Sequence, residues 1–285
     1  QSGVRVRAVI DSFGSSDLTE DIFAPLRAAG GSVTFFSRRW RSSYLIRNHQ
    51  KLLVIDDEVA VTGGFNIASA YLSGDRSLCW FDLGIVVRGP SVARMVAWFA
   101  EIHDYTVHHD GKLFLLRRLI REWPVDKGPV TWLVGGPTQR LSSWAQAVRS
   151  DLVGACQLDM AMAYFSPGQG MLRRLGRVAR LGRARFIMAA KSDNAATIGA
   201  SRLLYGYLLR KGATIWEYRP CKLHMKLIVI DDVVYIGTAN FDMRSLFVNV
   251  ELMLRVADTR FAEQMRGFIA AQRDDCDNIT AAAHK

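Results

Sequence analysis

Two short segments of this 285-residue chain each place a histidine two residues before a lysine. The first reads H-Q-K-L-L-V-I-D-D from His49, and the second reads H-M-K-L-I-V-I-D-D from His224. An imidazole can act as a nucleophile or carry a proton near neutral pH, and a lysine beside it attracts anions. The duplicated pairs, which include Lys51 and Lys226, therefore indicate an active site that uses two histidines on an anionic group.

The sequence around each motif is repeated as well. T-G-G-F-N ends at Asn66 after the first motif, and I-G-T-A-N ends at Asn240 after the second. Upstream, R-V-R-A-V-I-D from Arg5 matches R-A-R-F-I-M-A from Arg183. A repeat this long and ordered is typical of a pseudo-twofold duplication and not of a solenoid.

The repeat predicts an α/β fold of two pseudo-twofold-related lobes, each an α-β-α sandwich with a mixed sheet. We place the first lobe at residues 1–125 and the second at 126–285, because the connector at 124–137 is rich in Pro and Gly. Residues 130–182 precede the repeated strand only in the second lobe, and they contain an expected strand at 157–164. We therefore expect the first lobe to be truncated at its N-terminus and the natural polypeptide to extend further upstream.

Strand parity separates the roles of the residues within each motif. The runs Leu52–Ile55 and Leu227–Ile230 are short, apolar and β-branched, which predicts buried strands. The histidine and lysine of each motif lie two residues apart and thus share a face. Asp56 and Asp231 lie seven residues beyond their histidines, on the other face, so we expect them to hold the hairpin or brace a neighbouring lobe.

Metal chemistry is not expected. The doubled aspartates fall where a tight turn would hold them at the surface, and neighbouring strand residues face opposite ways. The four cysteines are scattered without metal-ligand spacing, and no H-E-x-x-H motif is present. The surplus of 37 Lys and Arg over 27 Asp and Glu favours anionic partners such as acidic lipids, nucleic acid or phosphorylated small molecules. We expect neither a metal nor a cofactor.

The pattern H-x-K-x-x-x-x-D followed by G-G-x-N or G-T-x-N resembles the HKD motif of the phospholipase D superfamily, and both copies are present. G-G-F-N-I-A-S-A-Y, W-F-D-L-G-I-V-V-R-G-P and G-T-A-N-F-D-M-R-S-L-F-V-N-V-E-L are similar to segments of bacterial cardiolipin synthases. One departure is that the second hairpin is a residue shorter than the first between its aspartate and its asparagine.

The resemblance implies a covalent mechanism. His49 would attack phosphorus and form a phosphohistidine, and His224 would serve as acid and base. Asp82 would support His49, and Glu251 would support His224. The cationic and amide groups expected to bind the phosphate are Lys51, Lys226, Asn66 and Asn240.

The resulting hypothesis is a cardiolipin synthase-like phosphatidyltransferase that moves a phosphatidyl group between phospholipids. The alternative is a phosphodiesterase that uses water, either a phospholipase D or a nuclease. A phospholipid is the expected substrate, and no specific nucleic acid partner is expected. The basic amphipathic segment Lys112–Trp123 either contacts an anionic membrane or packs on its own core. Without an apolar run long enough to span a bilayer, the expected location is peripheral, on the cytoplasmic side of a bacterial inner membrane.

Overall fold

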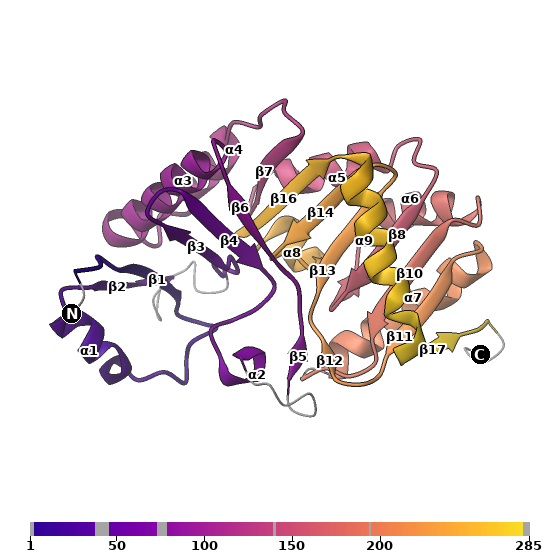
Figure 1. The fold of residues 1–285 in the computed structure, drawn as a ribbon, viewed down its shortest axis with the longest axis horizontal. Helices are drawn as coiled ribbons and strands as arrows, with labels where there is room; N and C mark the ends of the chain where they lie inside the picture. The colour runs from indigo at the N-terminus through magenta and orange to yellow at the C-terminus, as the bar shows by residue number, and fades with distance from the viewer. Residues whose placement is uncertain (1–2, 38–45, 73–78, 139–140, 194, 282–285) are drawn as a thin grey trace.

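The computed structural model describes residues 3–37, 46–72, 79–138, 141–193 and 195–281. Figure 1 shows two lobes side by side, with the N-terminal segments in one and the C-terminal segments in the other. No helix in these ranges is long and apolar enough to cross a membrane.

The second lobe is built on one large mixed sheet. Its strands are β7 (Val130–Gly135), β8 (Leu158–Met162), β10 (Ala184–Ala189), β11 (Thr214–Tyr218), β13 (Lys226–Ile230), β14 (Val233–Gly237), β16 (Glu251–Ala257) and β17 (Cys276–Ile279). They are ordered β17-β11-β10-β8-β13-β14-β16-β7. Strands β8, β10 and β11 run parallel, whereas β13, β14, β16 and β7 pair antiparallel. The motif strand β13 lies in the middle of the sheet, where both faces are covered.

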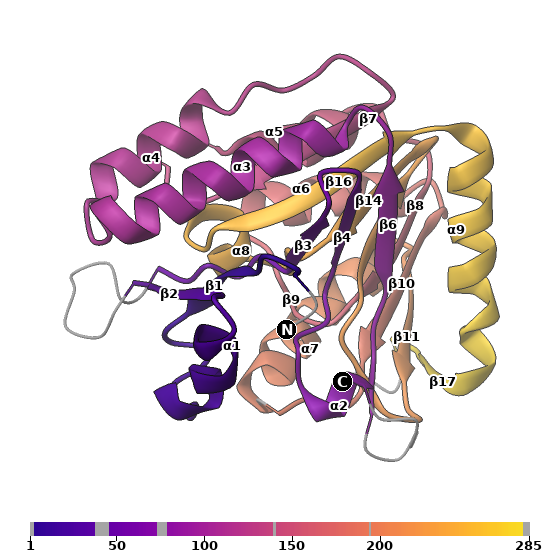
Figure 2. The same ribbon diagram turned by 60° about the vertical axis from the view of Figure 1, so that its left-hand side comes forward.

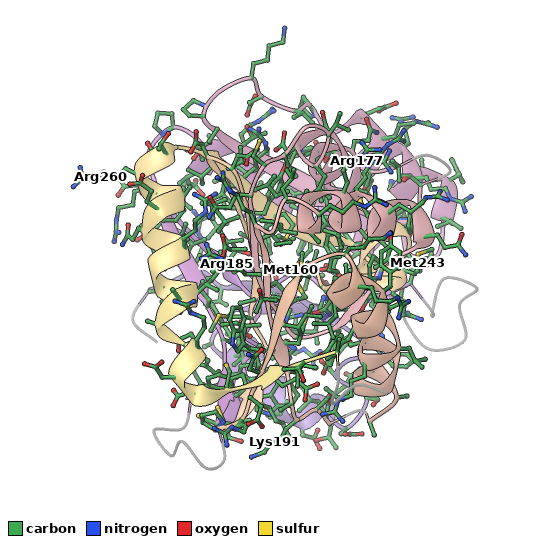
Figure 3. The ribbon with its side chains drawn as sticks, turned by 90° about the vertical axis from the view of Figure 1, so that its right-hand side faces the viewer. Met160, Arg177, Arg185, Lys191, Met243 and Arg260 are labelled. Atoms are coloured by element: carbon green, nitrogen blue, oxygen red, sulfur yellow. The ribbon has the colours of Figure 1, made fainter. Side chains whose placement is uncertain are left out.

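Helices cover both faces of this sheet. They are α5 (Ser143–Asp151), α6 (Gln169–Ala179), α7 (Ala195–Arg210), α8 (Met243–Phe247) and α9 (Thr259–Ala271). The apolar faces of α5, α6 and α7 form one core with residues such as Met160 and Ile228, while α9 packs on the opposite face against β8, β13 and β14. Figures 2 and 3 show α9 on one side of the strands and α6, which carries Arg177, on the other. The α-β-α sandwich with a mixed sheet that we expected is confirmed for the second lobe.

The first lobe is smaller. Its strands are β1 (Arg7–Asp11), β2 (Ser32–Phe36), β3 (Leu52–Ile55), β4 (Val59–Gly63) and β6 (Gly84–Arg88), and its helices are α1 (Ala24–Ala28), α2 (Ser69–Leu72), α3 (Val92–Asp104) and α4 (Leu113–Glu122). Strands β1 and β2 form a parallel pair, and β3, β4 and β6 form a separate antiparallel sheet. Short strand pairs complete the fold: β5 (Trp80–Phe81) with β12 (Lys222–Leu223), and β9 (Phe165–Ser166) with β15 (Phe241–Asp242).

One difference between the sheets of the two lobes affects the motif strands. The repeat aligns β1 with β10 and β3 with β13, and in the second lobe β8 lies between them and pairs with both. Within the described residues, the first lobe has no strand between β1 and β3. Leu53 and Ile55 are therefore 56% and 42% exposed, whereas their counterparts Ile228 and Ile230 are 0% and 1% exposed. The described residues of the first lobe thus contain no counterpart of β8.

One continuous core joins the lobes. It contains Met95 and Trp98 of α3 and Leu116 of α4, together with Trp132 and Leu227 of the second lobe. The Trp132 indole N–H also donates to the Ser91 carbonyl, at 3.1 Å. The division of the chain after residue 125 stays a prediction, but the two lobes are packed against each other as one body.

The motif aspartates occupy the hairpin turns. Asp56 and Asp231 both have positive φ, at 50° and 44°. The Asp231 carboxylate also accepts backbone N–H bonds from Cys156 at 3.0 Å and Gln157 at 2.8 Å, just before β8. Asp56 is exposed, and the first lobe shows no described strand that it could hold in the same way.

This difference makes a paired stability prediction. Asp231→Ala should lower the free energy of unfolding by about 2 kcal/mol, because it leaves two N–H groups without an acceptor and places Ala in a left-handed conformation. Asp56→Ala only places Ala in a left-handed backbone conformation, and it should lower the free energy of unfolding by less. Urea unfolding followed by circular dichroism measures both, and equal losses would contradict a special role for Asp231.

Candidate active site

The predicted site residues of both lobes meet where the lobes join. His49 and Lys51 lie just before β3, His224 lies two residues before β13, and Lys226 is the first residue of β13. Each histidine is held by a backbone hydrogen bond to the opposite lobe. The segment just before each motif strand lies at the lobe junction, so its N–H groups face the other lobe. The sequence prediction that both motifs form one site is consistent with this arrangement.

These backbone bonds are reciprocal. The His49 N–H donates to the Val250 carbonyl at 2.9 Å, and the His224 N–H donates to the Phe81 carbonyl at 2.8 Å. In both cases the acceptor is the residue immediately before a buried carboxylate. The residue before each histidine pairs in parallel with the same acceptor residue, as Asn48 does with Val250. Each motif therefore lies beside the acidic partner supplied by the other lobe.

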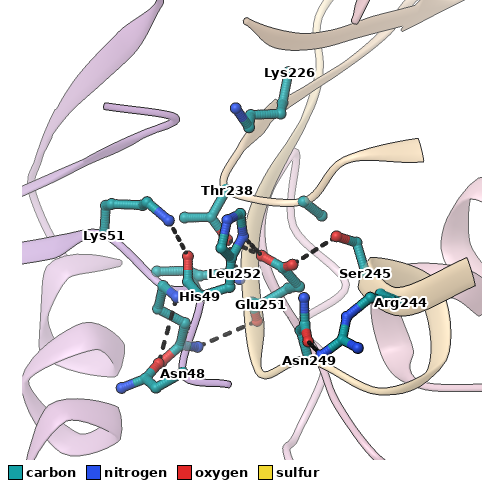
Figure 4. Close-up of polar contacts among 12 residues, drawn as sticks. Asn48, His49, Lys51, Lys226, Thr238, Arg244, Ser245, Asn249, Glu251 and Leu252 are labelled. Atoms are coloured by element: carbon teal, nitrogen blue, oxygen red, sulfur yellow. Dashed lines mark hydrogen bonds and ion pairs between the residues drawn. The ribbon is translucent and has the colours of Figure 1, made fainter. Parts of the chain in front are cut away.

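The histidine–carboxylate pairs are crossed between the lobes. His49 Nδ1 lies 2.9 Å from Glu251 Oε2, as Figure 4 shows, and His224 Nδ1 lies 2.7 Å from Asp82 Oδ2. The sequence-based pairing, Asp82 with His49 and Glu251 with His224, is wrong. All four residues belong to the site, but the acidic partner comes from across the pseudo-twofold axis because the backbone bridges pair each motif with the opposite lobe.

Glu251 is held by two hydroxyl groups. It is fully buried and accepts from Thr238 Oγ1 at 2.6 Å and from Ser245 Oγ at 2.7 Å. Burial raises the pKa of the Glu251 carboxyl, but nearby His49, Lys51 and the Thr238 hydroxyl outweigh that effect, so its pKa is lower than usual. Sequence reasoning missed Thr238 and Ser245, although Thr238 stands in the G-T-A-N segment where the first motif has a second glycine.

That second glycine, Gly64, is required by Asp82. A Cβ at Gly64 would lie 2.4 Å from Asp82 Oδ1, so no larger residue fits. The Asp82 carboxylate accepts from the Leu83 N–H at 2.7 Å. Burial raises the pKa of Asp82 to about 6, against the opposing effect of Lys226. The shorter aspartate thus packs on a glycine, while the longer Glu251 bonds to a threonine at the same repeat position.

The two lysines are held by their own motifs. Lys51 Nζ donates to the His49 carbonyl at 2.8 Å, and Lys226 Nζ donates to the His224 carbonyl. Burial lowers the pKa of Lys51 to about 8 and that of Lys226 to about 7, although Glu251 and Asp82 partly oppose this. An anion bound between them would restore the charge of both ammonium groups.

The two histidines have different surroundings. The His224 ring contacts three aromatic rings, with centroid distances of 5.4 Å to Tyr71, 4.9 Å to Trp80 and 6.0 Å to Tyr164. Its side chain is 6% exposed, against 19% for His49. Burial lowers the pKa of both imidazoles, further for His224, where Lys226 and Lys51 add repulsion. These aromatic residues were missed, although the segments that carry the resemblance include Tyr71 and Trp80.

The two asparagines differ as well. Asn240 is buried, and its Oδ1 has no hydrogen-bond partner among the described residues, which leaves it available to a bound molecule. Asn66 is exposed, and its amide lies 3.4 Å from the Tyr71 hydroxyl. In the part of the chain that the structure describes, no cluster of three or more His, Cys, Asp or Glu could hold a metal ion.

The sequence is similar to bacterial cardiolipin synthases. Residues 155–271 match the family model described as cardiolipin synthase, PLD-like domain. The chain is 33% identical over 263 residues to cardiolipin synthase of Geobacillus kaustophilus, covering 88% of this chain and 52% of that protein. It is 28% identical over 284 residues to cardiolipin synthase B of Salmonella typhimurium, covering 93% and 66%.

Solved structures show the same fold. Phosphatidylserine synthase of Haemophilus influenzae aligns with a TM-score of 0.72 at 14% identity, over 96% of this chain and 75% of that one. At this identity the likeness concerns the fold alone. The chain spans about half the length of several of the curated relatives it matches.

The crossed pairs predict a crossed response to mutation. Asp82→Asn should shift the ring-nitrogen NMR resonances of His224 and leave those of His49 nearly unchanged, because only His224 loses its charged acceptor. Glu251→Gln should do the reverse. Each variant should also lose activity by on the order of 10²–10⁴. A response within the same lobe would contradict the crossed arrangement.

The lowered lysine pKa values predict proton uptake on anion binding. At about pH 8 Lys226 is mostly neutral in the free protein, and a bound sulfate raises its pKa, so on the order of one proton should be taken up. Calorimetry in buffers of different ionisation enthalpy measures the uptake, and Lys226→Met should reduce it. Near pH 6 Lys226 is already charged, and its share of the uptake should disappear. Binding without uptake at about pH 8 would refute this prediction.

Proposed function

We propose that this chain is a cardiolipin synthase-like phosphatidyltransferase of the phospholipase D superfamily. In this proposal it transfers a phosphatidyl group from one phospholipid to the hydroxyl of another. The observation that carries the proposal is the buried site of two histidines, each paired with a carboxylate of the opposite lobe. The similarity to bacterial cardiolipin synthases supports a lipid substrate.

His49 is the proposed nucleophile. Because Nδ1 bonds to Glu251, Nε2 is the nitrogen left to react. Burial lowers the pKa of His49, which keeps a share of the imidazole neutral and nucleophilic. In the proposed step Nε2 forms a bond to phosphorus, and the bond from phosphorus to the headgroup oxygen breaks. Glu251 then stabilises the positive charge that develops on the ring.

His224 is the proposed acid and base. It donates a proton to the departing headgroup alkoxide and later removes one from the incoming hydroxyl, which attacks the phosphohistidine. Its ring is enclosed by aromatic side chains and held by Asp82, so its position is more restricted than that of His49. Because the pKa of His224 is lowered well below its usual value, the negative charge of the substrate would promote its protonation.

Four side chains would bind the phosphate. Lys51 and Lys226 face the site from their two motifs, and Asn66 and Asn240 follow the two hairpins. Fixed donors around the phosphoryl oxygens stabilise the charge that spreads over them in the transition state. The unbonded amide oxygen of Asn240 supports contact with a substrate hydroxyl.

Product analysis tests this function. The chain should convert phosphatidylglycerol vesicles to cardiolipin and glycerol, with EDTA without effect and His49→Ala inactive. Phosphatidylethanolamine and single-stranded DNA are assayed separately with mass spectrometry of the products. Phosphatidic acid as the sole lipid product would show a hydrolase, and cleaved DNA would show a nuclease; either result would replace the proposed transferase.

Trapping of the intermediate tests the roles of the histidines in the same assay. His49→Ala should give no acid-labile phosphoenzyme, whereas His224→Ala should slow turnover by on the order of 10²–10⁴ and still accumulate the intermediate from a substrate with a good leaving group. A phosphoenzyme seen only in His49→Ala would reverse the two roles.

Helix α4 does not offer its apolar stripe to a membrane. Leu116 and Ile120 are buried in the shared core, and the Arg117 guanidinium donates to the Pro137 carbonyl at 2.9 Å. The Lys112–Trp123 segment is therefore mostly an internal packing surface. The exposed surface of α4 includes Phe114, which is 67% exposed, and the exposed residues Arg118 and Arg121.

We propose that this remaining surface gives peripheral contact with an anionic membrane, on the cytoplasmic side of a bacterial inner membrane. Phe114→Ser combined with Arg121→Glu should weaken binding to phosphatidylglycerol vesicles by roughly tenfold or more, since each basic residue near the surface contributes ~1 kcal/mol. Vesicle sedimentation measures the binding. Leu203→Ser on α7, at a side chain 83% exposed, is the matched control, and an equal loss there would refute a local role for α4.

A further inference from the structure

Two cysteines from different lobes meet beside the active site. Cys79 Sγ lies 3.8 Å from Cys221 Sγ, although 142 residues separate them in the chain. Each directly precedes one strand of the inter-lobe pair, in which Lys222 lies opposite Trp80. The two cysteines therefore occupy the next matching position of a parallel pair.

Both cysteines are three residues before a member of one catalytic pair. Cys79 precedes Asp82, and Cys221 precedes His224. The strands that follow them carry the 2.8 Å bond from the His224 N–H to the Phe81 carbonyl. A covalent bond between the sulfurs would act directly on the segment that positions this histidine.

The geometry suits a disulfide. Neighbouring strands lie about 4.8 Å apart, which falls inside the Cα separation of about 4.4–6.8 Å found in disulfides. The sulfurs must approach from 3.8 Å to a bond length of about 2.05 Å, a change that side-chain rotation can supply. We propose that Cys79 and Cys221 form an oxidative cross-linking site that ties the two lobes together next to the His224–Asp82 pair.

The chemistry requires a two-electron oxidant, and a peroxide is the class that fits a partly covered pair. One thiol loses its proton, and the resulting thiolate attacks a peroxide oxygen. The O–O bond breaks, and the departing hydroxide takes up that proton, which leaves a sulfenic acid and water. The second sulfur then displaces the hydroxyl of the sulfenic acid, forming the S–S bond and a second water. Two thiols and one hydrogen peroxide thus give one disulfide and two waters. Burial raises the pKa of Cys221 to about 11, which keeps this sulfur protonated in the resting protein.

The test uses a Cys156→Ser, Cys276→Ser background, so that only the two cysteines in question remain. After hydrogen peroxide, alkylation and digestion without reductant, the peptides of Cys79 and Cys221 should be found joined, and the protein should be about 2 Da lighter than its reduced form. The matched control adds Cys79→Ser and should show no joined peptide. Full alkylation of both thiols after oxidation would overturn the proposal.

A second measurement applies even if the serine variants fold poorly. In the unmodified chain, which also contains exposed Cys156 and half-buried Cys276, the joined peptide should be Cys79 with Cys221 and no other pair. The oxidised chain should melt several degrees higher than the reduced chain, because the cross-link closes a long loop. Pairing with Cys156 or Cys276, or an unchanged Tm in a fully cross-linked sample, would contradict the inference. Neither readout depends on lipid turnover, so the proposed function can fail without affecting this result.

Discussion

The reciprocal bonding between the lobes is the constraint on which the site depends. The backbone N–H of each histidine donates to a carbonyl of the opposite lobe. Its ring bonds to the carboxylate of the next residue in that lobe. A histidine used as nucleophile or base needs one ring nitrogen fixed by a partner so that the other is presented to substrate. Here that partner always belongs to the other lobe. Neither lobe alone can therefore form a complete histidine–carboxylate pair.

The two copies of the motif differ in the side chains around their histidines and carboxylates. Gly64 leaves room for Asp82 in one half, while Thr238 bonds to the longer Glu251 in the other. The aromatic rings around His224 have no described counterpart around His49. One histidine is thus more enclosed and the other more accessible, a difference that would suit the separate roles proposed for them. Two copies of one sequence pattern reach this difference through a few side chains.

Burial of the basic groups sets the electrostatics of the site. Lys51 and Lys226 have lowered pKa values chiefly because burial removes their charges from water, and Lys51 adds repulsion at Lys226. Such an arrangement costs stability in the free protein, and it is tolerated at functional sites because the ligand supplies the missing charge. The same crowding explains why the carboxylates are tightly bonded: Glu251 accepts from His49, Thr238 and Ser245.

The sequence alone was enough to predict the candidate site residues and a repeat of two lobes. Repetition identified the histidines, lysines and asparagines, the resemblance identified Asp82 and Glu251, and the unequal repeat predicted the gap between β1 and β3. Only the tertiary structure decided which carboxylate serves which histidine, and that α4 packs its apolar stripe inward. Spacing and strand parity specify a face within one lobe. Contacts between lobes depend on how two folded surfaces dock, and that docking is set by packing between residues far apart in the chain.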